Sequence, residues 1–261
     1  MRSVPLLAVS GLEKRYGGLR AVADLSFTMG EPEILGIAGP NGAGKTTLLD
    51  VLSGVSGATS GSIRLKGREI VGLAPHRIAR LGLSRTFQTP VVFSGRTILA
   101  CASLAAHLSM GRRVHLPFRY RNGAVTRAQE VLDLVGLSRV GGRLVEGATL
   151  YEKKLTMLAA AVATSPDLLL LDEPAGGLNP VEVDLLLGVI RRLAQQGIGV
   201  VWVDHVMDAL TSLADRMLVL HHGASLYEGS VAGMLADRTV AEVYLGRPVT
   251  SDGDAPSGGG D

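Results

Sequence analysis

The sequence has little cysteine, few aromatic residues and almost no net charge, and each scarcity excludes a class of protein. Cys101 is the only cysteine among 261 residues, which excludes an internal disulfide and favours a reducing compartment. Aromatic residues make up 4%, and a net charge of +2 gives no general basic field for nucleic acid. With 46% apolar and 19% charged residues, the chain is too hydrophobic to be disordered, and its length suits one large or two small domains.

Long apolar runs are also missing. The most apolar stretches, such as 98–106 and 198–203, have the length of core elements and fall short of the ~18–20 residues that a bilayer span needs. Residues 1–5 lead into a short predicted strand rather than a signal-peptide core, and no internal repeat is found. We therefore expect a soluble chain, which can still dock on a membrane protein.

What the sequence does contain is a glycine-rich stretch between a predicted strand at 33–38 and a predicted helix from 48 onward. It consists of Gly39, Pro40, Asn41, Gly42, Ala43, Gly44, Lys45, Thr46 and Thr47. In this context it predicts a phosphate-binding P-loop, with glycines that turn backbone N–H groups inward and a helix start that adds positive charge. Lys45 can reach the β- and γ-phosphates, and the Thr46 hydroxyl can ligate Mg²⁺. The alternative is a chance match in a glycine-rich chain.

The flanking patterns predict an N-terminal group of antiparallel strands and a later group of helices. We predict extended segments at 6–9, 21–29 and 62–65, with an exposed turn at 14–18. Helical patterns at 97–110, 126–135 and 152–164 predict a helical subdomain of about 95–165, inserted after Gln88. Between the first two helices lie Arg112, Arg113, Arg119 and Arg121, which form either a solvated loop or a contact with a membrane partner or lipid headgroups.

The remaining patterns alternate between buried strands and helices. A helix is predicted at 180–196, with Asn179 as N-cap, Pro180 in the first position and Glu182 in the first turn. The other predicted elements are strands at 167–172, 200–203, 217–220 and 225–228, and helices at 207–213 and 233–245. We therefore expect an α/β sheet sandwiched by helices over residues 4–248, followed by a disordered tail at 249–261.

Two carboxylates, Asp172 and Glu173, lie at the carboxyl end of the predicted strand at 167–172. Because ligands bind at the carboxyl ends of parallel strands, Asp172 can hold the magnesium shell through water. Glu173 can polarise the water that attacks the γ-phosphate. An acidic pair after a strand can also be a solvated turn, but the P-loop favours the catalytic interpretation.

The order of P-loop, Gln88, helical insert, Asp172-Glu173-Pro174 and His205 resembles an ATP-binding-cassette (ABC) ATPase of a membrane transporter, over nearly all of 4–246. It is most similar to the branched-chain amino-acid and amide uptake family, through residues 14–18, 85–88, 172–180 and 240–246. This likeness implies a P-loop NTPase core with a mixed sheet, N-terminal antiparallel strands and an inserted helical subdomain.

The resemblance also implies roles for single residues. Tyr16 would stack on adenine, although it can also be an ordinary loop-edge tyrosine. Gln88 would complete the shell of magnesium and water and relay the nucleotide state to membrane subunits. His205 would contact the γ-phosphate and orient the attacking water, although a histidine after a strand can be structural. Residues 175–179 would face a partner cassette.

One motif departs from the family pattern. ABC ATPases complete each ATP site with a second motif, roughly Leu-Ser-Gly-Gly-Gln or Leu-Ser-Tyr-Gly-Glu, at the start of a helix of the opposing subunit. The corresponding stretch here is 149–155, with Thr149 near the serine position and Tyr151 where glycine belongs, or with two residues deleted around Tyr151. Either alignment removes the close approach of backbone to phosphate. We therefore predict an asymmetric dimer with a distinct partner cassette.

The resemblance implies an ATP-hydrolysing importer subunit that uses ATP and Mg²⁺ at the cytoplasmic, inner face of the cell membrane. Its partners would be transmembrane permease subunits, a second ABC ATPase and a solute-binding protein, with no nucleic acid. The alternative is an ATP-binding regulatory cassette with weak or no hydrolysis. A DNA-repair cassette is disfavoured because no long heptad insertion interrupts the chain, and a GTPase because no Asn-Lys-x-Asp motif is found.

Overall fold

The computed structural model describes residues 4–110 and 123–244, and its N-terminal part forms an antiparallel sheet. The strands β1 (Leu7–Tyr16), β2 (Leu19–Met29), β4 (Ser60–Leu65) and β5 (Arg68–Glu69) lie in the order β2–β1–β4–β5. All neighbouring pairs in this sheet are antiparallel. The expected N-terminal antiparallel strands are therefore confirmed.

The second sheet is mixed and has the P-loop strand near its centre. Its order is β10–β9–β3–β8–β7–β6. The strands are β3 (Ile34–Ala38), β6 (Leu83–Arg85), β7 (Leu168–Asp172), β8 (Gly199–Val203), β9 (Arg216–His221) and β10 (Ala224–Gly229). Only β10 is antiparallel to its neighbour, so β3, β7, β8 and β9 all end at the same edge of the sheet.

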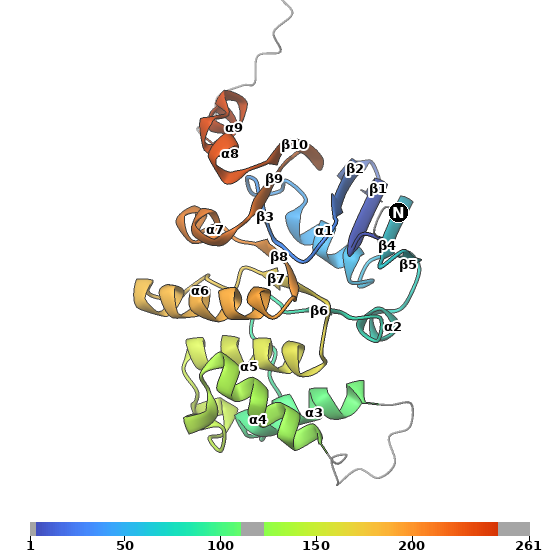
Figure 1. Ribbon diagram of the computed structural model, residues 1–261. Helices are drawn as coiled ribbons and strands as arrows, with labels where there is room; N and C mark the ends of the chain where they lie inside the picture. The colour runs from blue at the N-terminus through green and yellow to red at the C-terminus, as the bar shows by residue number, and fades with distance from the viewer. Residues whose placement is uncertain (1–3, 111–122, 245–261) are drawn as a thin grey trace, which may run out of the picture.

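Helices and the first sheet cover the two faces of the mixed sheet. The P-loop helix α1 (Lys45–Leu52) lies between the two sheets, and α6 (Pro180–Gln195) and α7 (Met207–Leu213) cover the other face (Figure 1). Alternate residues of each strand point to opposite sides, so Leu35 and Ile37 belong to one core and Ile34 and Ala38 to the other. This is the α/β sandwich that the sequence predicts.

The three predicted helices of the insert are present and pack on one another. They are α3 (Ile98–Ser109), α4 (Ala124–Val135) and α5 (Leu150–Ala163), at the bottom of Figure 1. Short 3₁₀ turns at Ser138–Val140 and Val145–Gly147 join α4 to α5. The arginines predicted between the first two helices, and the tail 249–261, lie outside the described residues. Among the described residues, no helix is both long and apolar enough to cross a bilayer.

The structure corrects three local predictions. Residues 14–16 of the predicted turn belong to β1, and only Gly17 and Gly18 turn. The helix predicted at 233–245 is two helices, α8 (Val231–Ala236) and α9 (Arg238–Tyr244). Asp237 separates them because its backbone is extended and its carboxylate accepts the N–H of Val240 at 2.9 Å. The short elements β5, β6 and α2 (Pro75–Ala79) were not predicted, since two to five residues give no readable period.

Candidate nucleotide-binding site

The P-loop follows β3 and leads directly into α1, which begins at Lys45. Gly44 is the N-cap of α1 with a φ of +102°, and a Cβ there would lie 2.2 Å from the carbonyl oxygen of Ala21. The loop therefore packs against β2 only because this residue is glycine. The helix has no side-chain cap and no acidic residue in its first turn, so its first N–H groups are available to an anion.

The Lys45 ammonium lies within the P-loop itself. It donates hydrogen bonds to the carbonyl oxygens of Gly39 at 2.6 Å and Pro40 at 3.0 Å. Burial lowers the pKa of Lys45, while the charges of Glu173 and Asp172 oppose that shift. A cation held only by carbonyl groups of the loop can move to phosphate oxygens, which bind it more strongly because they are charged.

Glu173 lies between two side chains that come from distant parts of the sequence. Its Oε1 is 2.5 Å from His205 Nε2, and its Oε2 accepts a hydrogen bond from Gln88 Nε2 at 2.6 Å. Glu173 also has a φ of +48°, an uncommon backbone conformation for a residue other than glycine. The two contacts fix the orientation of the carboxylate, as a general base requires.

Asp172 is almost fully buried at the end of β7, and its two oxygens differ. Arg85 Nη2 donates to Oδ2 at 2.8 Å, whereas Oδ1 is buried with no hydrogen-bond partner among the described residues. Burial raises the pKa of the Asp172 carboxyl, and the neighbouring Arg85 opposes that rise. An unpartnered buried carboxylate oxygen beside a P-loop fits a site for a hydrated cation.

The oxygen atoms around the P-loop fit Mg²⁺. The Thr46 hydroxyl, Asp172 Oδ1 and the amide oxygen of Gln88 are hard donors, the type that this ion prefers. Within 4–110 and 123–244, no cluster of three or more His, Cys, Asp or Glu side chains could hold a metal alone. These residues would therefore hold Mg²⁺ together with water and phosphate oxygens rather than as a protein cage.

A hollow of about 510 Å³ joins the P-loop, Glu173 and His205 to Tyr16. The Tyr16 ring is half exposed, with Lys14 Nζ 4.7 Å from its centroid and Ser56 Oγ 3.3 Å from its hydroxyl. The ring thus lies at the rim of the hollow, where an aromatic face can stack on a base. The hollow is lined by Tyr16, Leu19, Arg20, Ala21, Asn41, Gly42, Ala43, Gly44, Lys45, Thr46, Thr47, Glu173, His205 and His222.

The structure brings most of the predicted site residues into this hollow. Gln88 does not line the hollow but is connected to it through its hydrogen bond to Glu173. Asp172 lies next to Glu173 in the chain. Gly39 and Pro40 lie in an adjoining hollow of about 250 Å³, which shares Asn41 and His205 with the first.

The turn between β9 and β10 adds residues that the sequence analysis did not select. His222 lines the hollow, and the next residue, Gly223, fastens the turn to the P-loop and to β2. Its N–H donates to Ala43 O at 3.0 Å, and its carbonyl accepts from Ala23 N at 2.8 Å. Since β9 runs parallel to β3, its carboxyl end lies beside the P-loop, and the rule that selected Asp172 could also have selected His222.

A buried lysine of α5 supports the backbone at Glu173. Lys154 Nζ donates to the carbonyl oxygens of Glu173 at 2.9 Å and Pro174 at 3.0 Å. Burial lowers the pKa of Lys154, and the nearby charges of Asp204 and Glu173 oppose that shift. The sequence could have indicated this residue, because Lys154 is a lysine at a buried position of the helix predicted at 152–164.

At the start of α5, where the signature motif is altered, side chains of the first turn accept hydrogen bonds from the backbone N–H groups. Thr149 Oγ1 accepts the N–H of Glu152 at 3.2 Å, and the Glu152 carboxylate accepts the N–H of Thr149 at 2.9 Å. Arg143 also pairs with Glu152 at 2.9 Å. This capping box uses backbone donors that a bare helix start would offer to phosphate, and Arg143 balances the charge of its carboxylate.

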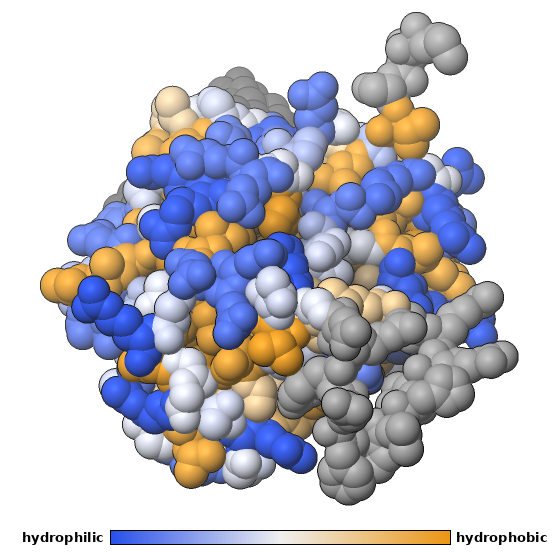
Figure 2. Space-filling view, turned by 60° about the horizontal axis from the view of Figure 1, so that its bottom comes forward, coloured by the Kyte–Doolittle hydropathy of each residue, from blue (hydrophilic) through white to orange (hydrophobic). Residues whose placement is uncertain are grey.

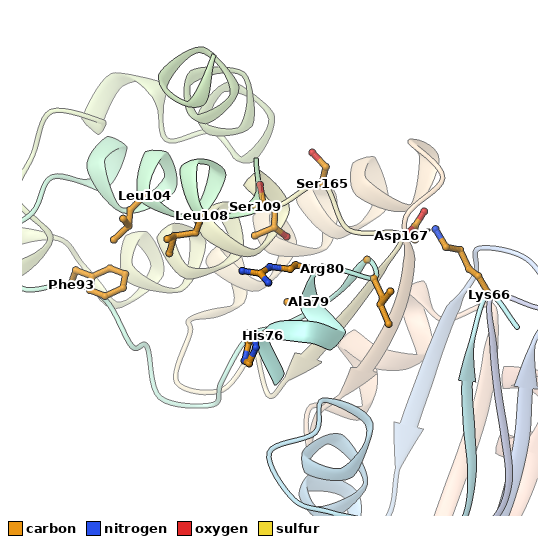
Figure 3. A pocket seen from close by; sticks show the side chains of 14 residues that line it. Lys66, His76, Ala79, Arg80, Phe93, Leu104, Leu108, Ser109, Ser165 and Asp167 are labelled. Atoms are coloured by element: carbon orange, nitrogen blue, oxygen red, sulfur yellow. Dashed lines mark hydrogen bonds and ion pairs between the residues drawn. The ribbon is translucent and has the colours of Figure 1, made fainter. Parts of the chain in front are cut away.

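A larger hollow of about 800 Å³ lies away from the nucleotide site, between α2, α3 and the segment after α5. Figure 3 shows Leu104 and Leu108 of α3 facing Phe93, with His76 and Arg80 across from them. It shares no residue with the P-loop hollow. On the face seen in Figure 2, hydrophobic surface occurs in separate patches between hydrophilic residues.

Comparisons with known proteins agree with the fold. A sequence model of the ABC transporter family matches residues 22–176, which include the P-loop and Glu173. The high-affinity branched-chain amino acid transport ATP-binding protein BraF of Pseudomonas aeruginosa is 34% identical over 94% of this chain and 99% of BraF. LivG of Escherichia coli, a protein of the same description, is 32% identical with the same coverage.

Solved structures give the same assignment. An ATP-binding cassette of an ABC transporter, determined in its ADP conformation, has a TM-score of 0.83 and 25% identity to this chain. The alignment covers 93% of this chain and 99% of that cassette. The chain therefore belongs to the ABC transporter family and is one of its ATP-hydrolysing cassettes.

Proposed function

We propose that the chain hydrolyses ATP to drive the import of branched-chain amino acids or related small solutes. The observation that carries the catalytic part is the fixed position of Glu173 between Gln88 and His205, beside the P-loop. The solute class is supported by BraF and LivG, which are described as branched-chain amino acid transport proteins.

Each residue of the site has a separate task in this proposal. Tyr16 stacks on the adenine, and the N–H groups of the P-loop bind the phosphates together with Lys45. Glu173 accepts a proton from the attacking water, and His205 and Gln88 orient both the carboxylate and that water. Mg²⁺, when bound, supplies positive charge to the β- and γ-phosphate oxygens, and Asp172, Thr46 and Gln88 would hold it.

The proposed partners are transmembrane permease subunits, a second cassette and a solute-binding protein, with this chain on the cytoplasmic face of the membrane. An apolar surface next to Gln88 supports a contact with the permease. Val55, Phe87 and Val91 are exposed there and line a groove of about 320 Å³. Gln88 would then link that contact to Glu173, to which it is hydrogen bonded.

We further propose that the two ATP sites of the dimer are unequal. The site built on this chain's P-loop has Lys45, Glu173 and His205. The start of α5, which this chain would contribute to its partner's site, carries the Thr149–Glu152 capping box and a carboxylate. The capping box occupies backbone donors of this helix start, and Tyr151 stands where the family pattern has glycine, so this second site is expected to bind ATP and turn over slowly.

The test is ATP-driven uptake of labelled leucine into vesicles that contain the assembled complex. Changing Glu173→Gln in this chain should leave ATP binding intact and lower hydrolysis by about 10²-fold or more, the usual contribution of a general base. The equivalent change in the partner cassette should have a much smaller effect. Equal losses from the two changes would contradict the asymmetry, and absence of leucine uptake by the unmodified complex would contradict the solute class.

The alternative function is a regulatory cassette that closes on ATP without productive turnover. The observation that favours it is the start of α5, where the signature motif is degenerate and the Thr149–Glu152 capping box occupies the first backbone donors. Steady-state ATP hydrolysis, measured for the chain alone and with its membrane subunits, separates the two functions. An importer subunit should be stimulated by the membrane subunits, whereas a regulatory cassette should hydrolyse little ATP in either case.

A further inference from the structure

Arg85 forms a buried ionic bridge between the P-loop helix and the strand that carries Asp172. The residue ends β6, and 5% of its side chain is exposed. Nη1 donates to Asp50 Oδ1 at 2.6 Å and to Ser53 Oγ at 3.1 Å, both in or just after α1. Nη2 donates to Asp172 Oδ2 at 2.8 Å. One planar guanidinium thus fixes the spacing between the two elements that carry Thr46 and Asp172.

The bridge occupies only one oxygen of Asp172. Oδ2 is held by Arg85, and within the described part of the chain Oδ1 remains buried without a partner. A carboxylate held at one oxygen cannot rotate freely about its Cβ–Cγ bond, so the position of the other oxygen is also fixed. This is the usual arrangement of a metal ligand and the outer group that orients it.

The charges within the bridge partly cancel. The Arg85 guanidinium pairs with Asp50 at 2.6 Å and with Asp172 at 2.8 Å. Asp50 balances the charge of Arg85, so the bridge adds little net repulsion toward a cation.

We propose that Arg85 is a positioning residue for the metal of the nucleotide site: it presents Asp172 Oδ1 to Mg²⁺ and aligns it with Thr46. This inference rests on the proposed nucleotide site. It predicts that Arg85 affects the gain in nucleotide affinity that Mg²⁺ provides, and has little effect on nucleotide binding without metal. Arg85→Lys keeps the charge but replaces the fork by a single ammonium, which cannot reach both carboxylates in the same geometry.

The experiment compares the affinity for a fluorescent, non-hydrolysable ATP analogue in EDTA with the affinity over a Mg²⁺ titration, in the full chain. In Arg85→Met, the Mg²⁺ concentration for half-maximal tightening should rise about tenfold, at the lower end of what loss of an outer partner of a metal ligand causes. In Arg85→Lys the rise should be smaller. In EDTA both variants should bind the analogue within about twofold of the unmodified chain.

Arg216→Met is the matched control, because Arg216 also bridges two carboxylates, those of Glu33 and Glu228, at the opposite end of the sheet. It should leave the Mg²⁺ titration unchanged. If Arg85→Met does not fold, Arg85→Lys with Mn²⁺ as probe replaces it, and its electron paramagnetic resonance spectrum should differ from that of the unmodified complex.

An unchanged Mg²⁺ titration in Arg85→Met, or an unchanged Mn²⁺ spectrum in Arg85→Lys, would overturn the inference. So would an equal loss of affinity with and without Mg²⁺. Failure of the unmodified chain to bind the analogue at all would instead overturn the proposed function.

Discussion

At the scale of single residues, the site depends on a few positions where the backbone allows no alternative. Gly44 is the clearest case, because its φ of +102° and its contact with Ala21 O both exclude a side chain. Glu173 is the opposite case. It is not a glycine, yet its backbone is left-handed, and hydrogen bonds of its backbone N–H and carbonyl hold it there. Its N–H donates to Val203 O at 2.8 Å, and its carbonyl accepts from Lys154.

Gly44→Ala should weaken nucleotide binding and lower the free energy of unfolding by about 1–3 kcal/mol, the range for a residue forced into a rarely populated backbone conformation. Thermal unfolding and nucleotide titration measure the two effects. Gly57→Ala is the control, because its Cβ would meet nothing within 4 Å and its φ is not positive. Equal effects of both changes would contradict the steric argument.

Lys154 should make stability depend on pH in the alkaline range. Its pKa in the folded chain is lowered from 10.5, so in the window just below 10.5 the unfolded chain binds more protons than the folded chain. The free energy of unfolding therefore gains a contribution that rises with pH through that window. Denaturant unfolding at several pH values should show a steeper rise for the unmodified chain than for Lys154→Met. Parallel curves would exclude the contribution of Lys154.

At the scale of elements, the long periodic segments were predictable from sequence and the short ones were not. The helix from Pro180 carries its own start signal, and the structure shows the full capping box of Asn179 and Glu182. The strand β6 has three residues and takes its place only by pairing with β7, so its pattern contains no local signal. For the same reason the sequence selected Gln88 by resemblance but gave no role to Arg85.

The cap of α6 gives a prediction at this scale. Asn179→Ala removes the acceptor for the Glu182 N–H, a bond of 3.0 Å, and should cost about 1 kcal/mol of stability. Asn179→Asp keeps an acceptor and should cost much less, so it serves as the control. Chemical denaturation measures both, and similar losses for the two variants would show that the cap is not the cause.

At the scale of the whole molecule, the sequence predicted the layers and the edge of the sheet where a ligand is expected, because both follow from the order of buried strands. It did not predict which side chains close the site from other strands. His222 and Arg20 line the nucleotide hollow through contacts between segments that are far apart in the chain. Pairings of that kind depend on sheet order, β9 beside β3, which no local pattern contains.

The contrast between the complete P-loop site and the altered start of α5 predicts how the chain associates. With ATP and Mg²⁺, the Glu173→Gln chain alone should remain monomeric, because pairing with itself would place a capped helix start without the motif's glycine at both ATP sites. Mixed with a partner cassette that has an intact signature, it should form a dimer. Light scattering distinguishes these outcomes, and ATP-dependent dimers of the single chain would contradict the argument.

The attachment of Gly223 to the P-loop also has a consequence for biosynthesis. The strand β3 is made well before its neighbours β8 and β9 and before the turn that bonds Ala43. Pairing between such distant segments is slow, and it cannot begin until the later segment leaves the ribosome. The nascent chain should therefore acquire its affinity for nucleotide in one late step, after residue 223 has emerged.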